Sequence, residues 1–94
     1  LITRALELQP DEPAILDSMG WVLYRKGRYE EALQYLSRAY TEFPDPEVAA
    51  HIVEVLAALD RREEALERLV AAEERDPESE LLTDVRDRFF PESP

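Results

Sequence analysis

Apolar residues recur at helical spacing along this chain, in stretches that end at glycine or proline. The first clear stripe predicts an amphipathic helix over Pro13–Lys26, because its apolar positions fall one, three or four residues apart. Asp11 or Glu12 is expected to cap this helix, Pro13 fits its first turn, and Gly27 can end it in the left-handed conformation. The stripe consists of Ile15, Leu16, Met19, Val22 and Leu23.

The same pattern predicts four further helices, so the chain is expected to be all-α. One covers Tyr29–Glu42 and stops before Pro44, and the next opens at Pro46 behind a capping Asp45. A fourth follows with Ala65, Leu66, Leu69 and Ala72 inside, and the last covers Ser79–Phe90. The last helix carries Leu81, Leu82, Val85 and Phe89 on one face; we expect Leu82, Val85 and Phe89 to be buried and Arg86 to be exposed.

The chain also repeats itself at an interval of 33 residues. Across Gly20–Pro44 and Val53–Pro77, ten of 25 aligned positions are identical. Ala5 and Pro10 continue the register toward the start of the chain. The expected organisation is a single domain with the end of a preceding repeat at 1–10, repeats at 11–44 and 45–77, a C-terminal capping helix at 78–90 and a tail at 91–94.

Small residues stand where the two helices of a repeat would cross. A glycine precedes the only tryptophan, inside a predicted helix, although glycine there costs about 1 kcal/mol relative to alanine. The period and the residues Gly20, Tyr29, Ala32, Ala39 and Pro44 resemble the tetratricopeptide repeat (TPR) family. The resemblance implies a right-handed α-solenoid of antiparallel helix pairs, in which the glycine lets the two helices approach closely.

The second repeat departs from this pattern at two positions. Val53 takes the place of Gly20, and Asp60 takes the place of Gly27. A valine at the crossing must widen it or shift its neighbours, and an aspartate in the left-handed turn costs up to about 1–2 kcal/mol. We therefore expect a looser second repeat.

Charge and composition restrict the classes of partner and reaction. Asp and Glu number 22 against 11 Lys and Arg, so the net charge of −11 disfavours nucleic acid and anionic membrane surfaces. No apolar run reaches the length of a membrane span, so direct membrane insertion is not expected. His51 has Glu54 one turn later but no second histidine, and is expected to lie on a solvated helix face. We expect no enzyme, metal or cofactor site.

The TPR resemblance places the candidate binding site in a groove lined by the first helices. The matching positions are mostly acidic or small, and lack the Lys, Arg and Asn clamp that some TPR domains use for acidic C-termini. A protein or peptide partner with a basic or apolar segment would suit such a groove. The partner-binding candidates are Asp17, Trp21, Tyr24 and Arg25 in the first repeat, Glu47, His51 and Glu54 in the second, and Asp84 in the last helix.

Two alternatives stay open from the sequence. The first concerns Trp21, which either anchors a partner or packs against a preceding repeat. The second concerns the chain, which is either an interaction module of a longer TPR scaffold or a structural segment that caps the solenoid or self-associates. An apolar N-terminal edge at Leu1, Ile2 and Trp21 would favour homo-oligomers.

A narrower resemblance suggests a cellular setting. The stretch "ILDSMGWVLYRKGRYEEAL" resembles C-terminal repeats of bacterial TPR proteins, including outer-membrane lipoproteins that face the periplasm and serve as adaptors of a carboxyl-terminal processing protease. The resemblance implies an adaptor role and a periplasmic location, with a cytoplasmic location as the alternative.

Overall fold

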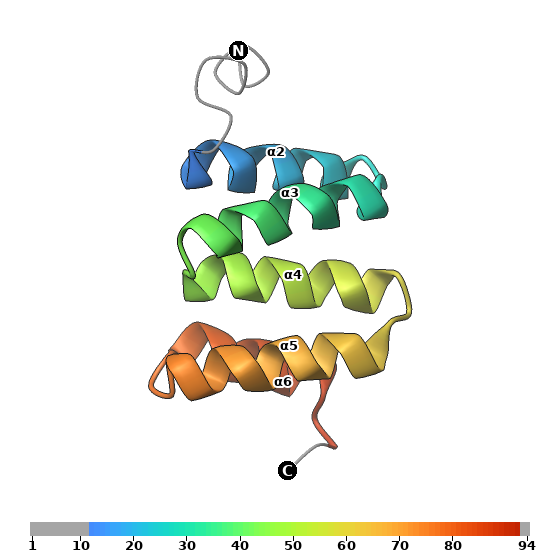
Figure 1. Ribbon diagram of the computed structural model, residues 1–94. Coiled ribbons are helices and arrows are strands. Elements are labelled where there is room, and N and C mark those ends of the chain that lie inside the picture. The colour runs from blue at the N-terminus through green and yellow to red at the C-terminus, as the bar shows by residue number, and fades with distance from the viewer. Residues whose placement is uncertain (1–11, 93–94) are drawn as a thin grey trace.

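The computed structural model describes residues 12–92, and within that range every regular element is an α-helix (Figure 1). The all-α solenoid predicted from the sequence is confirmed. The bounds predicted at 13–26, 29–42 and 79–90 agree with the observed ones to within a residue, and the start predicted at Pro46 is also confirmed. The helices are α2 (Pro13–Arg25), α3 (Tyr29–Glu42), α4 (Pro46–Ala58), α5 (Arg62–Arg75) and α6 (Glu80–Phe89).

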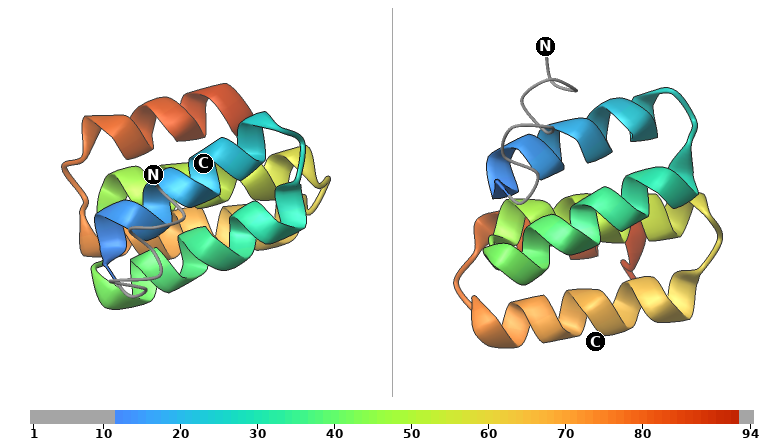
Figure 2. Two further views of the ribbon diagram at one scale, coloured as in Figure 1. Left: turned by 90° about the horizontal axis from the view of Figure 1, so that it is seen from above. Right: turned by 45° about the horizontal axis from the view of Figure 1, so that its top comes forward.

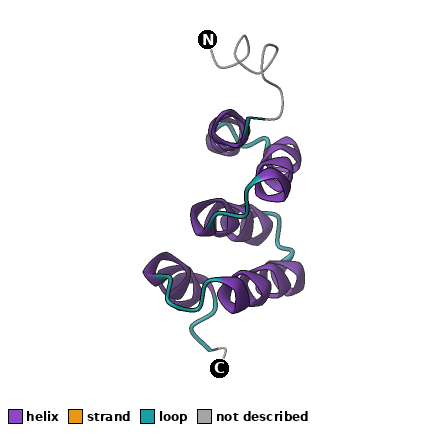
Figure 3. Cartoon of the chain, turned by 60° about the vertical axis from the view of Figure 1, so that its left-hand side comes forward, coloured by secondary structure: helices purple, strands orange, loops and turns teal. Residues whose placement is uncertain are grey.

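Successive helices alternate between two layers, with α2, α4 and α6 in one and α3 and α5 in the other (Figure 3). Each of α2 to α4 packs on the helix that follows it, whereas α6 packs chiefly on α4, on the side away from α3 (Figure 2). Apolar side chains fill the space between the layers. The largest fully buried ones include Leu16, Leu36, Ile52, Leu56 and Leu69.

The turns inside the two repeats have the same hydrogen bonds. After α2, the amides of Gly27 and Arg28 donate to the carbonyls of Tyr24 and Leu23, both at 2.9 Å. After α4, Asp60 and Arg61 make the equivalent bonds 33 residues later, at 3.0 and 2.9 Å. This is the Schellman arrangement, which needs a left-handed residue. Gly27 has φ 81° and Asp60 has φ 60°, as the sequence predicted.

Side-chain caps differ among the helix starts. The Asp45 carboxylate accepts a bond from the Glu47 amide at 2.8 Å, which confirms its predicted capping role. Ser79 caps α6 through the Leu82 amide at 3.3 Å. Glu12, one of the two predicted cap residues, holds the cap position of α2, but its side chain makes no capping bond.

Gly20 lies where α2 crosses α3, in contact with a fully buried side chain. A Cβ atom at Gly20 would lie 2.7 Å from Cγ and 2.9 Å from Cδ2 of Leu36, and 3.2 Å from the carbonyl oxygen of Ala32. Such distances are shorter than van der Waals contact, so the crossing depends on the absent side chain. In the second repeat Val53 is fully buried at the matching site, and α4 packs less closely on α5 than α2 packs on α3. The second repeat is therefore looser.

The packing of α6 corrects the predicted exposure of three residues. Leu82 and Val85 are buried as expected, but Phe90 is the buried aromatic residue and Phe89 is only partly buried. Arg86 is not exposed: its side chain is 19% accessible and forms a two-pronged ion pair with Glu73 of α5, at 2.6 and 2.8 Å. Leu81, expected on the apolar face, is 41% exposed.

Several predictions fall on residues 1–11 and 93–94, which lie outside the described residues. They include the end of a preceding repeat at 1–10, the cap at Asp11, and the association edge at Leu1 and Ile2. These stay predictions.

Replacing Gly20 with alanine should destabilise the protein by roughly 1–2 kcal/mol. The new methyl group must displace Leu36, and this strain outweighs the higher helix propensity of alanine. Urea unfolding followed by circular dichroism measures the effect, with Ser18→Ala on the exposed side of α2 as the control. Equal stability of Gly20→Ala and the wild type would show that the crossing is not tight.

Replacing Asp60 with glycine should leave stability unchanged or raise it by up to about 1 kcal/mol, because glycine accepts positive φ without steric cost. Gly27→Asp is the reciprocal variant, and a Cβ atom there meets nothing within 4 Å, so only the backbone cost remains. Chemical unfolding should show this second variant to be less stable. Stabilisation by Gly27→Asp would contradict the account.

Candidate functional site

The layer formed by α2, α4 and α6 carries a shallow groove of about 360 Å³. The groove contains four of the predicted binding residues, brought together from two repeats. Residues of α6 close its other side. The lining residues are Trp21 from α2, Glu47, Ala50, His51 and Glu54 from α4, and Leu81, Val85 and Arg88 from α6.

A row of stacked rings crosses from α2 toward α4 at this groove. The Trp21 ring stacks on His51 with a centroid distance of 4.2 Å and on Tyr24 with 4.8 Å, both at 21° between planes. Tyr24 in turn meets Tyr29 of α3 at 5.4 Å. Trp21 and Tyr24 are neighbours on one helix face because they lie three residues apart. Trp21 remains partly exposed, so it presents an apolar surface to the groove.

His51 is held between two side chains of the preceding repeat, so the prediction of a solvated position is wrong. Its Nδ1–H donates to the Asp17 carboxylate at 2.9 Å, and its side chain is 21% accessible. Its other contact is the face of the Trp21 ring. The sequence showed the helix face of His51 but not how closely α2 and α4 approach.

The surroundings of His51 raise its pKa above the ordinary value of 6.5. Burial acts in the opposite direction, since it disfavours the charged ring. The hydrogen bond and the negative charge of Asp17, together with the charges of Glu47 and Glu54, outweigh that effect. A protonated His51 also lies favourably against the electron-rich face of Trp21.

Glu54 lines the end of the groove near α6, and Tyr24 lies beside it. Burial, and then the negative charge of Glu54, raises the pKa of the Tyr24 hydroxyl, so this group stays protonated at neutral pH. Glu54 pairs with Arg88 of α6 at 3.3 Å, which partly neutralises its charge. Glu47, at the other end, is exposed and has no ion pair among residues 12–92.

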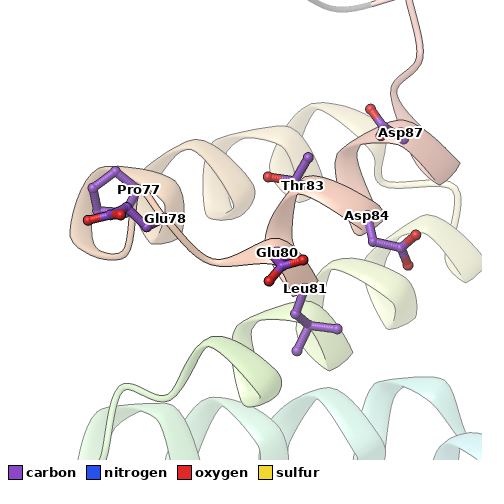
Figure 4. A pocket seen from close by; sticks show the side chains of 7 residues that line it. All are labelled: Pro77, Glu78, Glu80, Leu81, Thr83, Asp84 and Asp87. Atoms are coloured by element: carbon purple, nitrogen blue, oxygen red, sulfur yellow. The ribbon is translucent and has the colours of Figure 1, made fainter.

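The remaining predicted residues lie around the groove and not in it. Asp17 borders a neighbouring hollow of about 470 Å³ toward the α3–α4 turn, where Phe43 is 58% exposed. Glu47, which lines the groove, borders this hollow as well. Arg25 is exposed at the end of α2. Asp84 lines a separate hollow of about 780 Å³ on α6, which Figure 4 shows.

Sequence reasoning missed Leu81 and Arg88 as groove residues. Both residues belong to the last predicted helix, where a spacing of seven residues places them on one face. The helical period placed Leu81 with the buried residues because it adjoins Leu82. Only the docking of α6 on α4 shows that Leu81 faces the groove and is 41% exposed.

The groove brings together aromatic, apolar and charged side chains. Among the described residues, no cluster of three or more histidine and acidic side chains is arranged to hold a metal ion. Within the same part of the chain, no helix has both the length and the apolar character needed to cross a bilayer. The groove offers aromatic stacking, apolar contact at Leu81 and an unpaired carboxylate at Glu47.

Trp21 emission should report the protonation of His51. Because the folded-state pKa of His51 is raised, its protonation contributes stability that is complete below the unfolded-state value of about 6.5 and is lost as pH rises through the higher folded-state pKa. A charged imidazole in contact with indole quenches its emission, so fluorescence should increase over the same range.

Asp17→Asn should move this fluorescence midpoint to lower pH, since it removes the charge that holds the proton. Ser18→Ala should leave the midpoint in place. A wild-type midpoint no higher than that of Asp17→Asn would contradict the described contact. Trp21 is the only tryptophan, so the signal has one source.

Comparison with known proteins agrees with the repeat and the all-α fold. The family model for the tetratricopeptide repeat matches residues 23–86. A TPR repeat-containing protein of Pseudomonas aeruginosa is 56% identical over 54 residues, which is 57% of this chain and 9% of that protein. The match therefore spans only a small part of the relative's length.

TPR domains form a non-enzymatic fold that generally mediates protein–protein interaction. The two copies of the helix pair, the small residues at the first crossing and the family match covering more than half of the chain all lead to the same conclusion. This chain belongs to the tetratricopeptide repeat family.

Proposed function

We propose that the groove between α2, α4 and α6 binds an extended segment of a partner protein, with basic and apolar side chains. In this proposal the chain is part of a longer TPR scaffold or adaptor. The partner's apolar side chains contact Trp21 and Leu81, and a lysine or arginine lies near Glu47.

The observation that carries the proposal is the partly exposed Trp21 ring, held in place by His51 and Tyr24. A ring that is already ordered loses little conformational entropy on binding, and tryptophan is enriched among residues that dominate interface energies. The neighbouring carboxylate of Glu47 forms no ion pair within the described chain, so an incoming cation would gain one without breaking another.

The adaptor role is proposed together with its setting. The resemblance to repeats of periplasmic lipoproteins supports an adaptor of a carboxyl-terminal processing protease, and the bacterial relative agrees with a bacterial scaffold. Protease binding and periplasmic location both belong to the proposal. Self-association is the alternative role for the same segment.

Binding of a labelled extended peptide tests the groove. The probe alternates lysine and leucine with prolines that keep it extended, and its twin carries glutamate in place of lysine. Fluorescence anisotropy should show saturable binding of the basic peptide and much weaker binding of the acidic one. Trp21→Ala should weaken binding at least about tenfold, and Glu47→Gln about twofold to fivefold.

Glu78→Gln is the matched control, because it removes the same charge from an exposed position in the turn between α5 and α6, outside the groove. Equal binding of the two peptides, or equal affinity of Trp21→Ala and the wild type, would refute the groove proposal. Sedimentation equilibrium of the free chain tests the alternative, since a concentration-dependent dimer that excludes the peptide would favour self-association.

A further inference from the structure

The exposed side of α5 carries a strip in which apolar and acidic residues lie together. The strip borders a hollow of about 550 Å³ formed by this helix alone. On a helix its members form two adjacent rows at four-residue spacing, and each row mixes apolar and acidic side chains. The first row is Glu63, Glu67 and Ala71, and the second is Leu66, Val70 and Glu74.

The apolar members of this α5 strip are accessible. Val70 is 40% exposed, Ala71 is exposed, and Leu66 is partly buried against the core. Among the described helices, α5 packs only on α4 and α6 (Figure 1). A protein or peptide helix therefore has access to the strip.

Stacking of repeats does not account for the apolar residues. At the matching positions of α3, which is followed by a further repeat, the chain has Ser37 and Arg38 in place of Val70 and Ala71. The same repeat fold is thus built with polar residues at this site. The second repeat therefore has apolar side chains at two positions where the first repeat folds with polar ones.

The acidic members of the strip have no basic partner in the described part of the chain. No ion pair within residues 12–92 involves Glu63, Glu67 or Glu74. In the first repeat, the counterpart of Glu63 is Glu30, which pairs with Arg61 at 3.5 Å. Three carboxylates without an ion pair in this part of the chain, interspersed with apolar side chains, give the surface a charge that basic side chains would complement.

We propose that the α5 strip is a docking site for an amphipathic helix with an apolar row and lysine or arginine beside it. The apolar row would lie on Leu66 and Val70, and the basic residues would reach the glutamates on the same side. The site lies on α5, in the layer that contains α3 and α5, and is separate from the groove at Trp21.

The charge argues against the other occupants of such a strip. A second copy of this chain would bring two sets of three unpaired glutamates together, on proteins that each carry a net charge of −11. Like charges in contact oppose association. An anionic membrane is disfavoured for the same reason.

A labelled helical peptide tests the proposal with the 94-residue chain. The probe has an alanine-rich host, one row of leucines and flanking lysines, and its twin has glutamates in place of the lysines. Anisotropy should show saturable binding of the lysine peptide that weakens with added salt, and little binding of the glutamate twin.

The variant Val70→Ser with Ala71→Arg installs the residues that the first repeat already carries, so its circular dichroism and melting temperature should match the wild type. It should lower the peptide affinity at least about tenfold. Ala58→Arg adds the same charge at an exposed position of α4 and should have little effect. Glu67→Gln should weaken binding about twofold to fivefold.

The variant Trp21→Ala distinguishes binding at this site from binding in the groove. It should leave the affinity for the helical peptide unchanged. Binding that is lost in Trp21→Ala and kept in the α5 variant would place the peptide in the groove and overturn the proposal. Absence of saturable binding, or equal binding of the glutamate twin, would overturn it as well. So would a dimer of the free chain that the α5 variant abolishes, because the occupant would then be a second copy.

Discussion

The close crossing of α2 and α3 at Gly20 is the constraint on which the rest of this structure depends. With no side chain there, Leu36 can enter the space beside the α2 backbone and the pair packs tightly. The aromatic residues of α2 are then displayed from a rigid pair. The second repeat has Val53 at the same site, and there α4 and α5 pack less closely. A loss of helix propensity of about 1 kcal/mol at one glycine is thus offset by packing along two helices.

A second regularity links the first helices of successive repeats. Asp17 reaches His51, and Glu54 reaches Arg88, in both cases 34 residues later. The interval is one repeat plus one residue, so each contact joins neighbouring helices of the layer formed by α2, α4 and α6. An acidic residue on the earlier helix thereby meets a basic one on the later helix. These contacts join the helices of the layer that carries the groove, and within residues 12–92 they leave Glu47 without an ion pair.

The two layers present different chemistry to partners, although both come from one repeated unit. The first-helix layer offers stacked rings with a few carboxylates, whereas α5 offers small apolar side chains among glutamates. Both surfaces would favour basic segments, because the chain carries twice as many acidic as basic residues. They differ in the shape of ligand that fits: an extended segment beside Trp21, and a helix along α5.

The sequence by itself determined the helices, their ends and the left-handed turn at Asp60, because these depend on residues close together in the chain. Helical spacing, prolines and a 33-residue repeat were enough for them. The TPR resemblance added eight candidate groove residues, of which Trp21, Glu47, His51 and Glu54 lie together in the groove. Only the tertiary structure decided that α6 docks chiefly on α4, and hence that Arg86 pairs with Glu73 and Leu81 faces the groove. The partners of a side chain on a helix depend on which neighbouring helix lies against it, and periodicity reports the buried face but not that neighbour.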